Sequence, residues 1–93
     1  MFKKLNPILH SELRLAIVSF LVTNGTSDFI EIKEMTKATA GNISIQLKKL
    51  QAESYIVVTK GFKENYQHTA IEITEVGINA FEEYVHALKA YIK

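Results

Sequence analysis

The stretch IKEMTKATAGNISIQLKKLQAESYI, residues 32–56, decides the fold of this chain. Within it, Ile43, Leu47 and Leu50 recur at intervals of four and three residues, which places them on one face of a helix. Thr39 can cap that helix, because its hydroxyl can accept a hydrogen bond from a free N–H of the first turn. The residues just before it have a shorter apolar face of helical spacing. The stretch therefore predicts two helices joined by a tight turn, the helix-turn-helix pattern, over about residues 32–54.

The opposite face of the second helix, predicted over residues 39–53, is polar and basic. It carries no acidic residue before Glu53. Its side chains are Asn42, Ser44, Ile45, Gln46, Lys48 and Lys49. A helix with one apolar face and one hydrogen-bonding, cationic face is typical of the second, recognition helix of a helix-turn-helix.

A further helix is predicted upstream of this central pair. Ser11 can cap its start, and Asn24-Gly25 can end it, because glycine readily adopts the left-handed conformation found at helix ends. Its apolar positions recur at helical spacing at Leu13, Ala16, Ile17, Phe20 and Leu21. Between the two helical regions we expect residues 26–28 to be a connector and residues 29–31 to add one short strand.

Downstream of the central pair, the sequence predicts a β-hairpin. Residues 55–60 (YIVVTK) are β-branched and aromatic, and residues 68–73 (HTAIEI) alternate between polar and apolar. Residues 61–67 (GFKENYQ) are polar and contain a glycine, which predicts the connecting turn. A hairpin that follows a helix-turn-helix is a wing, here over about residues 55–73.

The last helix is predicted from Thr74 to residue 92 and has two apolar stripes. One repeats every seven residues at Ile78, Phe81, Val85, Leu88 and Ile92, and the other consists of Ala80, Tyr84, Ala87 and Tyr91. We expect one stripe to dock on the domain and the other to meet the same helix of a second copy. The candidate dimer interface is therefore Ile78, Phe81, Tyr84, Val85, Leu88, Tyr91 and Ile92. The alternative is a single broad core face.

Composition and charge narrow the class of protein. The 93 residues make one small α+β, mostly helical domain, 1–93, which would gain from a partner subunit because small domains bury little surface. Without cysteine, a long apolar run or a signal peptide, we expect a cytoplasmic protein with no membrane partner. Net charge is only +1, but residues 36–63 hold five lysines against Glu53. The positive charge is therefore concentrated on the predicted helix-turn-helix and the segment that follows it, and the alternative is an ordinary solvated surface.

Three stretches carry a resemblance to a known family. They are LNPILHSELRLAIVSFL (5–21), TAGNISIQLKKLQAESYIVVTKGF (39–62) and IEITEVGINAFEEY (71–84). In them the chain resembles a small bacterial family of winged-helix transcriptional regulators related to MarR and ArsR proteins. The resemblance implies a winged helix with a C-terminal dimerisation helix. It also implies sequence-specific binding of double-stranded DNA as a homodimer, with the residue 39–50 helix in the major groove and the wing at the minor groove or backbone. The wing departs from the family pattern because it has no arginine.

The side chains suggest distinct roles on DNA. Asn42 and Gln46 are suited to adenine, because one amide can form hydrogen bonds with adenine N6 and N7 at the same time. Ile45 could pack on a thymine methyl group, and Gly41 allows close approach to a phosphate. The full set of expected DNA contacts is Thr39, Gly41, Asn42, Ser44, Ile45, Gln46, Lys48, Lys49, Lys60, Lys63, Tyr66 and His68, with the lysines on phosphates.

Other functions have little support in the sequence. Glu83 and His86 have the E-x-x-H spacing of a metal site, but the four-helix carboxylate sites that use it need a second copy and two more glutamates. We expect no enzyme activity, cofactor or metal, and no residue set points to a small-molecule effector. The alternative to DNA binding is a winged helix that binds another protein, which the modest net charge and the arginine-free wing favour.

Overall fold

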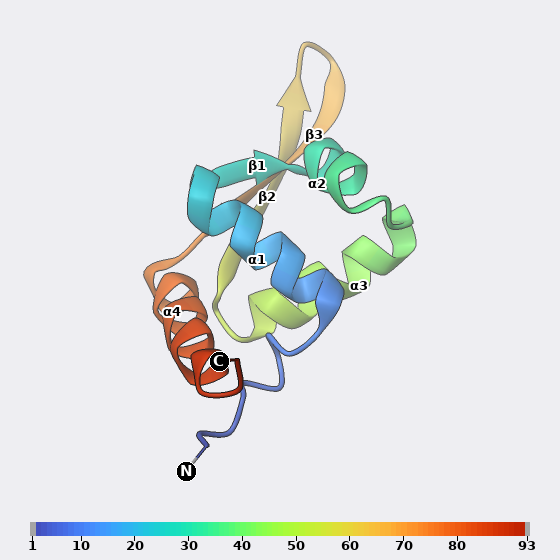
Figure 1. The fold of residues 1–93 in the computed structure, drawn as a ribbon. Helices are drawn as coiled ribbons and strands as arrows, with labels where there is room; N and C mark the ends of the chain where they lie inside the picture. Colours follow the sequence, from blue (N-terminus) through green and yellow to red (C-terminus); the bar gives the residue numbers. More distant parts are fainter. Residues whose placement is uncertain (1, 93) are drawn as a thin grey trace.

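The computed structural model describes residues 2–92, which form four helices and one small sheet. In chain order they are α1 (Glu12–Asn24), β1 (Thr26–Asp28), α2 (Phe29–Thr36), α3 (Ala40–Ala52), β2 (Ile56–Lys63), β3 (Tyr66–Ile73) and α4 (Glu75–Lys89). The sheet is antiparallel with the order β1-β3-β2. In Figure 1 the β2–β3 hairpin projects from one end of the molecule, and α4 lies with both termini toward the other. This arrangement confirms the predicted winged-helix fold class.

The core lies where α1, α2 and α3 pack against the base of the sheet. The prediction for α3 is confirmed: Ile43, Leu47 and Leu50 are all buried, and the Thr39 hydroxyl accepts a hydrogen bond from the Asn42 N–H at 3.2 Å. α1 contributes Ile17, Val18 and Leu21. The prediction placed Phe20 on the buried face of α1, but in the structure Val18 is buried and Phe20 is only half-buried. The buried face is therefore rotated from the predicted one. Ser11 is the N-cap residue of α1, as predicted, but its side chain makes no capping hydrogen bond.

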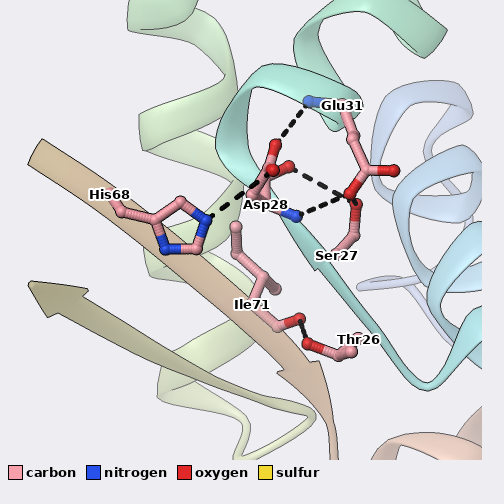
Figure 2. A network of polar contacts seen from close by, with 6 residues as sticks. All are labelled: Thr26, Ser27, Asp28, Glu31, His68 and Ile71. Atoms are coloured by element: carbon pink, nitrogen blue, oxygen red, sulfur yellow. Dashed lines mark hydrogen bonds and ion pairs between the residues drawn. The ribbon is translucent and has the colours of Figure 1, made fainter. Parts of the chain in front are cut away.

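The segment between α1 and α2 differs from the prediction. Residues 26–28 form the strand β1, which pairs with β3 through Thr26↔Glu72 and Ser27↔Ile71, and residues 29–31 belong to a helix. The helix starts there because of a capping box. Asp28 accepts from the Glu31 backbone N–H at 2.8 Å, and the Glu31 carboxylate accepts from the Asp28 N–H at 3.3 Å (Figure 2).

The hairpin is longer and its turn tighter than predicted. The strands extend into the segment expected to be a turn, so that only Glu64 and Asn65 connect them. Both residues have positive φ, 53° and 71°. That is the pattern of a type I′ turn, whose twist matches the twist of the two strands. The wing is therefore a regular two-stranded ribbon up to its tip.

The helix that follows the hairpin starts against the α3–β2 junction. α3 ends at Ala52, and Ser54 takes the left-handed conformation with φ of 64°. The Thr74 hydroxyl accepts from the Gly77 N–H at 3.0 Å, which confirms Thr74 as the cap, and donates to the Ser54 carbonyl at 2.6 Å. α4 ends at Lys89, three residues short of the prediction. Among residues 2–92, no helix combines the length and apolarity that crossing a membrane requires.

Candidate nucleic-acid interface

The exposed face of α3 is polar and free of acidic side chains. α2 ends at Thr36, and Lys37 adopts a left-handed φ of 60°, which turns the chain toward α3. With the apolar stripe of α3 in the core, the side chains left outside are Gly41, Asn42, Ser44, Ile45, Lys48 and Lys49. Ile45 is 54% exposed, so it is neither in the core nor covered by the hairpin. Gly41 has open space where a side chain would stand.

The two amides expected to contact bases are joined to each other. Gln46 Nε2 donates to Asn42 Oδ1 at 2.9 Å, one helical turn away. Gln46 Oε1 in turn accepts from Arg14, which reaches over from α1. Asn42 is exposed and Gln46 is half-buried, so Asn42 is the more accessible of the pair. Arg14 has no role in the sequence-based set, because it lies 32 positions from Gln46 in the chain.

A groove of about 570 Å³ separates α3 from the hairpin. Lys48 lies on the α3 wall and Lys60 on the β2 wall, so both walls carry a positive charge. Residues from four elements line the groove: Phe29, Ser44, Leu47, Lys48, Gln51, Val58, Lys60, Gln67 and Thr69. Two cationic walls separated by an open channel suit a phosphate backbone.

The hairpin divides the predicted wing residues between its two faces. Lys60 pairs with Thr69, and Phe62 pairs with Gln67, so these four side chains share the groove face. Lys63 pairs with Tyr66 on the opposite face. Phe62 and Tyr66 are 82% and 77% exposed. Phe62 is absent from the set of DNA contacts expected from the sequence, although an aromatic residue in a polar segment was a signal for it.

His68 lies further from the tip of the hairpin and has a partner. Its Nε2 is 3.7 Å from Asp28 Oδ2, so β3 and the start of α2 face each other through this pair. Figure 2 shows the imidazole directed at Asp28, beside the capping box. His68 therefore contacts the start of α2 in this structure, whereas Lys63 and Tyr66 lie exposed near the tip of the wing.

The outer surface of α4 is the second candidate interface. Tyr84 is 4% exposed and Ala87 is buried, so the stripe that contains them docks on the domain. Tyr84 has almost no surface left for a second chain, which removes it from the set expected at a dimer interface. Tyr91 is half-exposed but donates to the Lys3 carbonyl at 2.9 Å and stacks on Phe2. The other stripe, hereafter the outer stripe, is half-buried at Ile78, Phe81, Val85 and Leu88, and its last member, Ile92, is exposed beyond the end of α4. Phe81 and Leu88 also pack against the core, so this stripe is only partly free.

The described residues offer no assembled metal site. No group of three or more His, Cys, Asp or Glu side chains among residues 2–92 could hold an ion. Glu83 and His86, which have the E-x-x-H spacing, are both exposed on α4.

The chain is similar to known winged helix domains and to transcriptional regulators. A family model described as a winged helix DNA-binding domain matches residues 13–92. An uncharacterized protein of Methanocaldococcus jannaschii is 30% identical over 81 residues, which cover 87% of this chain and 88% of the relative. The structure of a transcriptional regulator homologue from Pyrococcus horikoshii is similar with a TM-score of 0.85 and 27% identity, over 91% of this chain and 84% of that one.

A third similarity concerns the fold alone. The transcriptional regulator BldR from Sulfolobus solfataricus matches with a TM-score of 0.74 at 18% identity, over 88% of this chain and 58% of that protein. These relatives are archaeal proteins, so the bacterial origin expected from the sequence resemblance stays a prediction.

Proposed function

Because this chain belongs to the winged helix DNA-binding domain family, we propose that it is a transcriptional regulator that binds a specific double-stranded DNA sequence as a homodimer. α3 enters the major groove, and the β2–β3 hairpin follows the adjacent backbone or minor groove. The observation that carries this proposal is the exposed face of α3, which combines amides, a hydroxyl and lysines with no acidic residue. A face of that composition can bond base edges and phosphates without repelling either.

Phosphate contacts come from the lysines around the groove between α3 and the hairpin. Lys48 and Lys60 can hold one backbone segment between them, because they lie on opposite walls. Lys49 on α3 and Lys63 near the wing tip extend the positive surface to either side. Lysines that bond phosphates set position and affinity, whereas base contacts set sequence preference. Base contacts in this proposal belong to Asn42 and its neighbours on α3.

Dimerisation uses the outer stripe of α4. An apolar stripe with a seven-residue repeat is typical of the seam of a helix pair, and it lies beside the stripe that docks on the domain. Pairing two copies through α4 would present two copies of α3 to one face of the DNA. Their spacing on DNA would then match one helical turn, about 34 Å, or a multiple of it.

The test compares two aspartate substitutions at exposed aliphatic positions. Ile45→Asp places a carboxylate on the α3 face, where it would repel phosphates and lose the apolar contact with bases. Val76→Asp adds the same charge on α4, at a residue with 52% exposure. We expect Ile45→Asp to abolish binding of a labelled duplex and Val76→Asp to leave it nearly intact. Equal binding by both variants would contradict the placement of α3 on DNA.

One observation favours a second candidate function, a winged helix that binds a protein. Phe62 and Tyr66 expose one large aromatic ring on each face of the wing near its tip, and aromatic residues are enriched at protein interfaces. Aromatic rings also stack on sugars and bases, so these residues are compatible with both functions. Absence of duplex binding at low salt would favour the protein-binding alternative. Pull-down with wild-type protein and with a Phe62→Ser control would then identify partners that depend on the wing.

A further inference from the structure

A chain of hydrogen bonds leads from the N-terminal turn to the exposed face of α3. Arg14 Nε donates to the Ile8 carbonyl at 2.6 Å, and Arg14 Nη1 donates to Gln46 Oε1. Gln46 Nε2 then donates to Asn42 Oδ1 at 2.9 Å. α1 is thereby connected through two side chains to the surface that we propose contacts bases.

The turn that anchors Arg14 is itself fixed. Asn6 Oδ1 accepts from the Ile8 N–H at 2.8 Å, and Asn6 Nδ2 donates to the Tyr55 hydroxyl at 2.9 Å. The Ile8 carbonyl is therefore held at a set distance from the start of β2. A guanidinium is planar and rigid, so fixing one of its edges also fixes the edge that reaches Gln46.

Arg14 determines which way both amides point. A guanidinium has only donors, so Gln46 must turn its oxygen toward Arg14 and its nitrogen toward Asn42. Asn42 must then offer its oxygen to Gln46, which leaves the Asn42 NH₂ group free at the surface. If Arg14 were absent, each amide could rotate by half a turn and exchange its donor and acceptor.

We propose that Arg14 is a positioning residue that makes Asn42 select a base with acceptor atoms in the major groove. Guanine, with N7 and O6, and thymine, with O4, present acceptors to that NH₂ group, whereas adenine presents the N7 acceptor beside the N6 donor. Adenine, which we expected from the sequence, is bound by both ends of an amide only if the oxygen accepts from N6 while the nitrogen donates to N7. In this structure the Asn42 oxygen is turned toward Gln46 and uses one of its two lone pairs there, which disfavours that geometry. This assignment rests on the proposed function and adds the base class that α3 prefers.

The decisive variant is Gln46→Glu, which should reverse the preference. A carboxylate at this position still accepts from Arg14, but its second oxygen cannot donate to Asn42. Asn42 should then turn its NH₂ group inward and present its oxygen to the DNA. The preferred base would change to one with a donor, namely adenine through N6 or cytosine through N4. Selection from a pool of random duplexes, read by sequencing, measures this preference independently of overall affinity.

Four other variants locate and control the effect. Asn42→Ala identifies the base pair at which preference is lost, and the double variant Asn42→Ala/Gln46→Glu should show no preference there. Gln51→Glu is the control for charge, because it adds a carboxylate to α3, as Gln46→Glu does, but outside the chain of hydrogen bonds. It should weaken binding without changing the preferred base. Arg14→Met keeps much of the length of the side chain but offers no donor, so Gln46 is no longer held in one orientation. It should reduce the preference at that base pair roughly tenfold, toward none.

The outcomes are distinguishable. Because every pair contains either guanine with cytosine or thymine with adenine, the informative readout is the change between the two proteins. A different preferred base pair in Gln46→Glu at the position identified by Asn42→Ala supports the role of Arg14. The same preferred base pair in wild type and Gln46→Glu would overturn it while leaving DNA binding in place. If the wild type enriches no sequence and binds no duplex at low salt, the proposed function and the role of Arg14 both fail.

Discussion

The α-carbon of Gly77 packs directly against the backbone carbonyl of Tyr55, where any side chain would overlap the oxygen. The same oxygen accepts the Thr74 N–H at 3.0 Å. The first turn of α4 therefore contacts the start of β2 through backbone atoms. Through this contact α4, the proposed dimer helix, is held in a fixed position relative to the hairpin and to the end of α3.

Gly77→Ala should destabilise the protein. The added methyl group would meet backbone atoms, which cannot move aside as a flexible side chain can, so we expect a loss of about 1–3 kcal/mol. For a domain of this size each kcal/mol lowers the melting temperature by roughly 4–8 °C. Gly41→Ala is the matched control, because that glycine lies in α3 with open space around it. The control should raise stability, by at most about 1 kcal/mol, since alanine favours helix. Equal effects of the two changes in thermal unfolding would contradict the close contact.

The turn at the wing tip should be improved by asparagine. Glu64 has φ of 53°, a left-handed conformation that asparagine tolerates much better than glutamate. We expect Glu64→Asn to stabilise the hairpin by about 1 kcal/mol and to slow amide hydrogen exchange in the ends of β2 and β3. Glu53→Asn removes the same charge where φ is −88°, so it should have no such effect. Faster exchange in Glu64→Asn would argue against the type I′ turn.

Substitution on the outer stripe of α4 should dissociate the proposed dimer. Val85→Glu would place a charge in the proposed apolar seam. Val76→Glu is the control, because residues nine apart in a helix lie on opposite faces. Light scattering should give a dimer for the wild type and the control, and a monomer for Val85→Glu. A monomeric wild type at micromolar concentration would refute the assignment of this surface.

Removal of a groove lysine should weaken binding to every DNA sequence alike. Lys48→Ala and Lys60→Ala each delete one proposed phosphate partner per protomer. The plot of log affinity against log salt should therefore become shallower, by about one unit for each phosphate that is no longer neutralised. Lys89→Ala, at the end of α4 remote from the hairpin, is the control and should leave the slope unchanged. A weakening confined to one DNA sequence would mean that the lysine bonds a base.

The features that sequence predicted correctly depend on nearby residues. Thr39 lies three residues before Asn42, whose N–H donates to its hydroxyl. Ile43, Leu47 and Leu50 lie on one face of α3 because of their spacing in the sequence. The cap at Thr74 follows the same logic. Such features are set by the helical repeat, so no tertiary information is needed to place them.

The features that sequence missed depend on residues far apart. β1 is a strand because it pairs with β3, for example through Ser27 and Ile71. Three residues are too few for an alternation of polar and apolar side chains to predict a strand. The link between Arg14 and Gln46 exists only once α1 packs beside α3. Sequence could not separate the two stripes of α4 because both are apolar; in the structure Tyr84 is buried, whereas Phe81 and Leu88 are only partly buried against the core. The DNA contacts themselves stay predictions.

The most direct test of the central claim is fluorescence anisotropy of a labelled generic duplex, titrated with the protein at several salt concentrations. The account predicts binding at low salt, with an affinity that falls steeply as salt rises. If each protomer neutralises several phosphates, the dimer should show a slope of several units, at about 0.9 per phosphate contact. Absence of binding at low salt, or binding that does not change with salt, would contradict the claim that the lysines around α3 and the hairpin hold DNA.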